Sequence, residues 1–167
     1  MVLELYRRHP ELVATLIVVD TYAGWKGSLP EEEVRARVEG VRQTLAAGRR
    51  VRPRASGLVA GDPPAEFLPL LGEMAAAVRP DSMRTALLVM AEADHRDLLP
   101  HIAMPNLLIW GESDARSPLS VARQFEEQIP QTEVVVIAGA GHVSNLERPE
   151  EFNGAVRSFC LTSSSAA

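Results

Sequence analysis

Two polar residues near the C-terminal end of the sequence follow apolar segments, and their types suit acid–base chemistry. Asp114 lies in "WGESDARSP", just after the apolar run 106–111, and His142 lies in "GAGHVSNLERP", just after the run 133–139. Open parallel sheets place ligands at the carboxyl ends of their strands, so adjacent strands ending here would bring both side chains together. A carboxylate next to imidazole Nδ1 fixes the tautomer and stabilises the imidazolium formed when histidine takes a proton. The pattern therefore predicts a general base, His142, oriented by Asp114.

Each residue taken alone has a plainer interpretation. Asp114 suits the cap of the helix that follows it, and His142 suits a solvent-exposed turn. Asp20, at the end of the run 14–20, is a possible substitute acid. Its position at the start of a long helical segment favours a structural role instead.

Three apolar runs predict the strands that would position these residues. They are "ATLIVVD" at 14–20, "NLLIWG" at 106–111 and "EVVVIAG" at 133–139. Continuous β-branched runs of this length are typical of strands buried on both faces. Alternation of strand and helix in the last third predicts parallel strands joined by right-handed crossovers. The predicted fold class is α/β, with a partial parallel sheet of about three strands, flanking helices and an inserted helical cap.

Helical periodicity, broken by Pro and Gly, dominates the segment 24–99. Ser82 is predicted to cap a helix inside this segment, and Ser117 with Pro118 gives the start signature of the helix after the second strand. The final helix, "PEEFNGAVRSFC", carries an apolar stripe, and Cys160 beside that stripe is expected to be a buried, inert thiol. The methionines of the helical segment are interpreted as core filler.

The chain is too short for two independent domains, and the expected organisation is one domain with an insertion. The four expected parts are the end of a helix plus the first strand (1–23), a helical cap or lid (24–99), a C-terminal βαβα part of the core (100–161) and a disordered tail (162–167).

Composition and charge exclude several classes of function. A net charge of −5 gives no electrostatic reason to bind nucleic acid or an anionic membrane. The basic stretch "RRVRPR" at 49–54 is interpreted as a solvated loop between helices. One cysteine and histidines without ligand spacing predict no disulfide, no metal and no cofactor. With no long apolar run and no signal-peptide pattern, the expected location is the cytoplasm.

The two C-terminal motifs together resemble those of the α/β-hydrolases. "MPNLLIWGESDARSP" is similar to the family's acid-bearing segment, and "GAGHVSNLERPEEF" is similar to its histidine segment. "LELYRRHPELVATLIVVD" is similar to the segment that follows the family's nucleophile. The resemblance implies that Asp114 is the acid of a catalytic triad, that His142 is its general base, and that 1–23 begins with the end of the nucleophile helix.

The nucleophile elbow of that family, Gly-x-Ser-x-Gly, does not occur in this sequence. Ser113 in "GES" lacks the second glycine, and Ser144, two residues beyond His142, is not in an elbow. The resemblance therefore implies a C-terminal portion of a longer protein, with Met1 internal and the nucleophile and oxyanion donors upstream. We expect little hydrolase activity from these residues alone.

Serine esterase-like hydrolysis of a small-molecule ester or related acyl substrate by the full-length parent is the leading functional hypothesis. An Asp nucleophile acting on epoxides or haloalkanes stays open, because the elbow is missing. A second alternative is a non-catalytic remnant that works as a binding or oligomerisation module. The strand "TLIVVD" would then have an open edge, which predicts self-association.

Overall fold

The computed structural model describes residues 2–47 and 57–164 and divides the chain into two compact units. The first unit takes residues 1–21, 56–62 and 96–167, and the second takes 22–55 and 63–95. Residues 57–62 therefore belong to the first unit, although they fall inside the segment interpreted as a helical cap. The basic stretch 49–54 lies outside the described residues.

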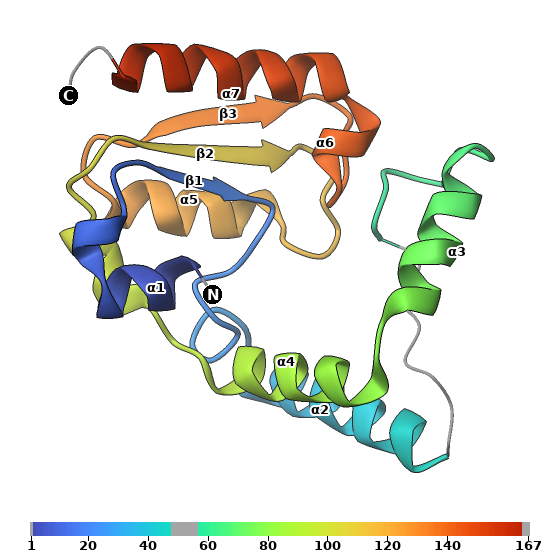
Figure 1. Cartoon of the computed structure of the whole chain (residues 1–167). Coiled ribbons are helices and arrows are strands. Elements are labelled where there is room, and N and C mark those ends of the chain that lie inside the picture. Colours follow the sequence, from blue (N-terminus) through green and yellow to red (C-terminus); the bar gives the residue numbers. More distant parts are fainter. Residues whose placement is uncertain (1, 48–56, 165–167) are drawn as a thin grey trace. The chain divides into compact units, whose positions relative to one another are not determined.

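The first unit is built on a parallel sheet with the strand order β1-β2-β3 (Figure 1). The strands are β1 (Leu16–Val19), β2 (Asn106–Gly111) and β3 (Glu133–Ile137). Helix α5 (Leu119–Gln128) lies on one face of this sheet and α7 (Pro149–Ser164) on the other (Figure 1). This arrangement confirms the predicted α/β class, with three parallel strands and flanking helices.

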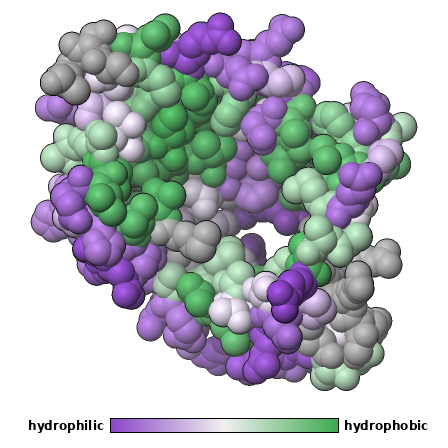
Figure 2. Space-filling view, viewed as in Figure 1, coloured by the Kyte–Doolittle hydropathy of each residue, from purple (hydrophilic) through white to green (hydrophobic). Residues whose placement is uncertain are grey.

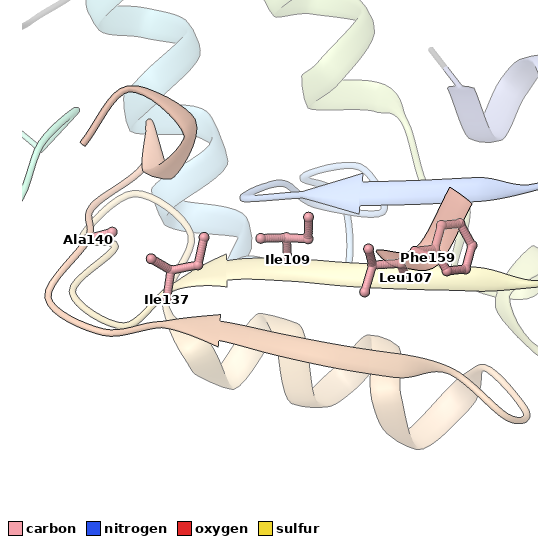
Figure 3. Packing of buried hydrophobic residues seen from close by; sticks show 5 residues of the cluster. All are labelled: Leu107, Ile109, Ile137, Ala140 and Phe159. Atoms are coloured by element: carbon pink, nitrogen blue, oxygen red, sulfur yellow. The ribbon is translucent and has the colours of Figure 1, made fainter. Parts of the chain in front are cut away.

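Every residue of the central strand β2 is buried, because helices cover both of its faces. Leu107 and Ile109 pack with Phe159 of α7 (Figure 3). Trp110 packs instead against Phe125 of α5, with the ring centroids 5.8 Å apart. The uninterrupted apolar run of β2 thus reflects burial on both sides, as expected for a parallel sheet.

Two short helical elements lie at the end of the first unit where the strands begin (Figure 1). Helix α1 (Val2–Arg8) is joined to the 3₁₀ segment η2 (Arg96–His101) by two side chains. Arg7 donates to both carboxylate oxygens of Asp97, at 3.0 and 2.8 Å, and the Tyr6 hydroxyl donates to the His101 carbonyl at 2.7 Å. A second 3₁₀ turn, η1 (Pro10–Leu12), leads from α1 toward β1.

The second unit contains helices α2 (Glu31–Ala46), α3 (Phe67–Ala77) and α4 (Pro80–Glu92). Trp25 is buried in this unit, and the Arg37 guanidinium lies 5.1 Å from the centre of its ring. Met74 and Met90 were expected to fill a core, but they are 54% and 42% exposed. That expectation was wrong for these two residues, because both side chains lie on helix faces that the rest of the second unit leaves uncovered.

Two expected helix caps differ from the observed ones. Ser82 lies inside α4, which is preceded by Arg79 and begins at Pro80, so it does not cap that helix. Ser117 does not cap α5 either, because its hydroxyl donates to the Thr21 carbonyl at 2.7 Å. Its role is to fasten the turn after β2 to the end of β1.

The C-terminal helix differs from expectation in two details. Cys160 is exposed rather than buried, because its position falls beside the apolar stripe of α7 and not within it. The helix also continues to Ser164, so the first three residues of the expected disordered tail are helical. Thr162 supports this extension by donating to the Ser158 carbonyl at 3.1 Å.

The outer edge of β1 pairs with no strand among residues 2–47 and 57–164. Figure 2 shows apolar surface on the side of the first unit that carries β1 and α1. Val2, Leu5 and Leu12 are exposed apolar residues of this N-terminal part. Within the described ranges, no helix has both the length and the hydropathy needed to cross a lipid bilayer.

Candidate active site

Asp114 and His142 lie side by side at the carboxyl ends of β2 and β3. Asp114 occupies the turn between β2 and α5, and His142 occupies the turn between β3 and the short helix α6 (Ser144–Glu147). Asp114 Oδ2 lies 2.9 Å from His142 Nδ1. The Asp114 side chain is 0% exposed and the imidazole 27% exposed. A shielded carboxylate thus contacts one ring nitrogen of a histidine that solvent, or a ligand, can reach.

The second oxygen of Asp114 is held by the backbone of its own turn. Oδ1 accepts hydrogen bonds from the amides of Arg116 and Ser117, at 2.7 and 2.9 Å. Asp114 does not cap α5, which begins at Leu119 and has no side-chain cap. Its Oδ1 closes the turn before that helix, and its Oδ2 faces the imidazole. Amide donors at Oδ1 fix the carboxylate plane, and Oδ2 is left to face Nδ1 of His142.

Glycines allow the turns of Asp114 and His142 to touch. A Cβ atom on Gly111 would meet the carbonyl oxygens of Gly141 and Ala140 at 2.1 and 2.5 Å. The Ser113 amide donates to that same Ala140 carbonyl at 2.8 Å. The backbone of the turn 112–118, which carries Asp114 and is called the acid turn below, is therefore bonded directly to the turn 138–143, which carries His142 and is called the histidine turn.

A third segment, 57–62, packs along the histidine turn. Glu147 of α6 accepts from the Gly141 amide at 2.6 Å with one oxygen and from the Ala60 amide at 2.7 Å with the other. The Val143 amide also donates to the Leu58 carbonyl at 3.0 Å. Its residue type alone does not single out Glu147, because a glutamate in a short helix is most often solvated.

Asp20 is buried where β1 ends, at 5% exposure, and its carboxylate faces the acid and histidine turns. Oδ1 accepts from the Gly111 amide at 2.8 Å, and Oδ2 accepts from the Ser144 hydroxyl at 2.6 Å. Burial raises the pKa of Asp20 above 3.8, and the charge of Asp114 adds to this effect, although hydrogen bonds from Ser144 and Gly111 oppose it. These contacts support the structural interpretation of Asp20 over its use as a substitute acid.

Neither serine near the pair resembles an activated nucleophile. Ser144 is completely buried, and its hydroxyl donates to Asp20. Ser113 is exposed but lies in the acid turn, and none of the described hydrogen bonds joins its hydroxyl to a histidine or another base. Among the described residues, no group of three or more His, Cys, Asp or Glu side chains could hold a metal ion.

The fold and the two loop positions agree with a sequence match. A model of the Alpha/beta hydrolase family matches residues 2–155, so the chain belongs to this family. The solved esterase EaEST from Exiguobacterium antarcticum has the same fold, with a TM-score of 0.79 at 21% identity over 95% of this chain and 61% of the esterase.

Two curated relatives carry a more specific name, pimeloyl-[acyl-carrier protein] methyl ester esterase. The one from Vibrio vulnificus (strain YJ016) is 35% identical over 80 residues, which is 48% of this chain and 31% of the relative. The one from Chromobacterium violaceum is 30% identical over 151 residues, which is 87% of this chain and 59% of the relative. The chain thus spans less than two thirds of the length of either relative.

Proposed function

We propose that Asp114 and His142 are the acid and the general base of a site that hydrolyses carboxylic esters or related acyl compounds. The observation that carries the proposal is the 2.9 Å contact between Asp114 Oδ2 and His142 Nδ1. It is supported by the amides at Asp114 Oδ1, which hold the carboxylate in place. The names of the curated relatives support the ester-hydrolysing part of the proposal.

In this mechanism, Nδ1–H of His142 stays bonded to Asp114, so that Nε2 is free to accept a proton. A nucleophilic hydroxyl gives its proton to Nε2 as it attacks the ester carbonyl, and a tetrahedral intermediate forms. The imidazolium then protonates the leaving alcohol, and the same nitrogen activates water to release the acid. Asp114 keeps its negative charge throughout and stabilises the imidazolium in each step.

The proposal assigns only the base and its acid to these 167 residues. No Gly-x-Ser-x-Gly pattern occurs in the sequence, and the buried Ser144 hydroxyl is bonded to Asp20. The nucleophile is therefore left to a residue outside this sequence. A serine hydroxyl suits the ester chemistry of the relatives' names, whereas an aspartate there would redirect the site toward epoxides or haloalkanes.

A chimera tests the proposal directly. This chain would be joined to the region of the Chromobacterium violaceum relative that precedes its match, and hydrolysis of p-nitrophenyl acyl esters and of fatty-acid methyl esters would be followed. A folded chimera should hydrolyse at least one of these esters in repeated turnovers. The chain alone and the added region alone are the controls, and both should remain at the rate of buffer.

The result that contradicts the proposal is a chimera that folds but does not turn over any ester. Circular dichroism and a single sedimenting species would establish folding. Replacing the elbow serine of the chimera by aspartate, and then assaying epoxide and haloalkane opening, separates the ester proposal from its closest chemical alternative.

A further inference from the structure

We propose that Asp20 is a positioning residue, which sets the alignment of His142 on Asp114 by bonding the last residue of β2 and the first residue of α6, which flank the two turns that carry them. One oxygen accepts from the amide of Gly111, three residues before Asp114, at 2.8 Å. The other accepts from the hydroxyl of Ser144, two residues after His142, at 2.6 Å. This inference rests on the proposed function for its catalytic meaning, but its geometry does not depend on it.

The bond partners of Asp20 have few alternatives, because they are buried. Ser144 has no exposed surface, and its own amide lies 3.4 Å from the same Asp20 oxygen. Gly111 ends β2 and is packed against the histidine turn. A buried donor that loses its acceptor cannot turn to water, so the loss of Asp20 would have to be relieved by movement of one turn.

The backbone of Asp20 is also specialised for this contact. Its φ angle is +41°, in the left-handed region that side chains other than those of Asn and Asp rarely adopt. This conformation ends β1 while its amide still donates to the Ile109 carbonyl at 3.1 Å. The next residue, Thr21, accepts from the Ser117 hydroxyl at 2.7 Å, which ties the far side of the acid turn to the same corner.

A carboxylate suits this place because two donors approach it from different loops. Aspartate offers an acceptor oxygen to each of them, whereas asparagine offers one oxygen and one NH₂ group. With asparagine, the Gly111 amide keeps the single oxygen and the NH₂ group faces Ser144. The Ser144 hydroxyl can rotate to accept from that NH₂ group, but the Ser144 amide, 3.4 Å from the same Asp20 atom, would face a donor, so the histidine turn should be the one that loosens.

The test uses the full chain and reads the His142 ring by NMR. Asp20→Asn replaces the carboxylate that accepts from Gly111 and Ser144, and Ser144→Ala removes the hydroxyl that donates to Asp20. Asp97→Asn is the matched control, because Asp97 bonds Arg7 at the opposite end of the first unit. The readout is the exchange rate of the His142 Nδ1–H proton with water, assigned by its loss in His142→Gln.

Asp20→Asn and Ser144→Ala should each raise that exchange rate on the order of tenfold, since each weakens a buried hydrogen bond that holds the turn. The backbone amides of β2 should stay protected, and Asp97→Asn should leave the His142 proton unchanged. If Asp20→Asn does not fold, Ser144→Ala alone decides.

The positioning role is overturned if folded variants exchange the His142 proton at the wild-type rate, or if Asp97→Asn accelerates it equally. The readout needs no substrate. A chimera without ester hydrolysis would therefore contradict the proposed function but would not affect this measurement. If the chimera is active and its Asp20 and Ser144 variants exchange the His142 Nδ1–H proton at the wild-type rate, only the role of Asp20 is contradicted.

Discussion

Asp114 and His142, 28 residues apart in sequence, meet with 2.9 Å between Oδ2 and Nδ1. The carboxylate is fully shielded and bonded to two amides of its own turn, while the imidazole is partly exposed. Asp114 is thus the shielded and fixed partner, and His142 is the accessible one. This division suits a general base that must reach a reacting group while keeping one tautomer.

Asp114→Asn should reverse the tautomer of His142. The asparagine oxygen can still accept from the amides of Arg116 and Ser117, which leaves its NH₂ group to face Nδ1. Nδ1 must then be an acceptor, so the proton moves to Nε2 and the ring no longer offers a base there. Nitrogen chemical shifts of the ring report the tautomer, with the exposed Asp62→Asn as control. A ring that keeps its Nδ1–H in Asp114→Asn would contradict the assignment.

Asp20 should make folding stability depend on pH. Its pKa is raised in the folded state, mainly by burial, so the folded chain holds this proton more tightly than the unfolded chain. The stability that Asp20 contributes is therefore fully present below the unfolded value near 3.8 and is lost as pH rises through the folded pKa. Urea unfolding of wild type and Asp20→Asn across this window measures the effect.

The free energy of unfolding of wild type minus that of Asp20→Asn should fall as pH rises and then level off. The neutral asparagine has no such proton, so subtraction removes the titration of every other group. A difference that grows with pH would show that hydrogen bonds from Gly111 and Ser144 outweigh burial, and a constant difference would show that the two effects cancel; either result contradicts the prediction.

Gly141→Ala should destabilise the histidine turn. The new Cβ would lie 2.6 Å from the amide nitrogen of Ala60 and the carbonyl carbon of Val59, which are backbone atoms that cannot rotate away. We expect a loss of about 1–3 kcal/mol in the free energy of unfolding, the usual effect of overpacking. Gly154→Ala is the matched control, because nothing lies within 4 Å of its Cβ and it sits in α7.

Gly154→Ala should stabilise the chain by up to about 1 kcal/mol through helix propensity. Urea midpoints of both variants give the comparison. If Gly141→Ala proved as stable as Gly154→Ala, the packing of residues 57–62 on the histidine turn would be wrong.

The open edge of β1 should cause the chain to self-associate. The amides of Leu16 and Asp20 donate toward β2, so by alternation those of Ile17 and Val19 point away from it. Val19→Pro removes an outward amide without breaking a bond to β2 and should lower the sedimenting mass at high concentration. If the sedimenting mass of Val19→Pro rises with concentration as it does for the wild type, the edge of β1 is not the surface through which the chain associates.

The strands, and the proximity of Asp114 and His142, could be predicted from sequence because their signals are local. "NLLIWG" coincides with β2 at 106–111, since a strand covered on both faces must be apolar throughout. The turns after β2 and β3 then bring Asp114 and His142 together by the geometry of adjacent parallel strands alone.

The residues that fix the pair could not be found in this way. Glu147 and Ser144 act through contacts 87 and 124 residues away in sequence, and no local pattern reports such contacts. Ser117 carried a helix-start signal but bonds Thr21, because a tertiary acceptor 96 residues distant replaced the local one. Exposure of Cys160 was missed because one helical position separates the buried face from the solvent face.

Ester hydrolysis by the chimera and its variants at the acid–base pair tests the central claim most directly. In a folded, active chimera, His142→Gln should lower kcat by about 10⁶-fold, or to the background rate, and Asp114→Asn by about 10⁴-fold. His101→Gln, which alters a histidine outside the pair, should leave kcat unchanged. A chimera in which His142→Gln retained the activity of the parent would contradict the assignment of His142 as the base.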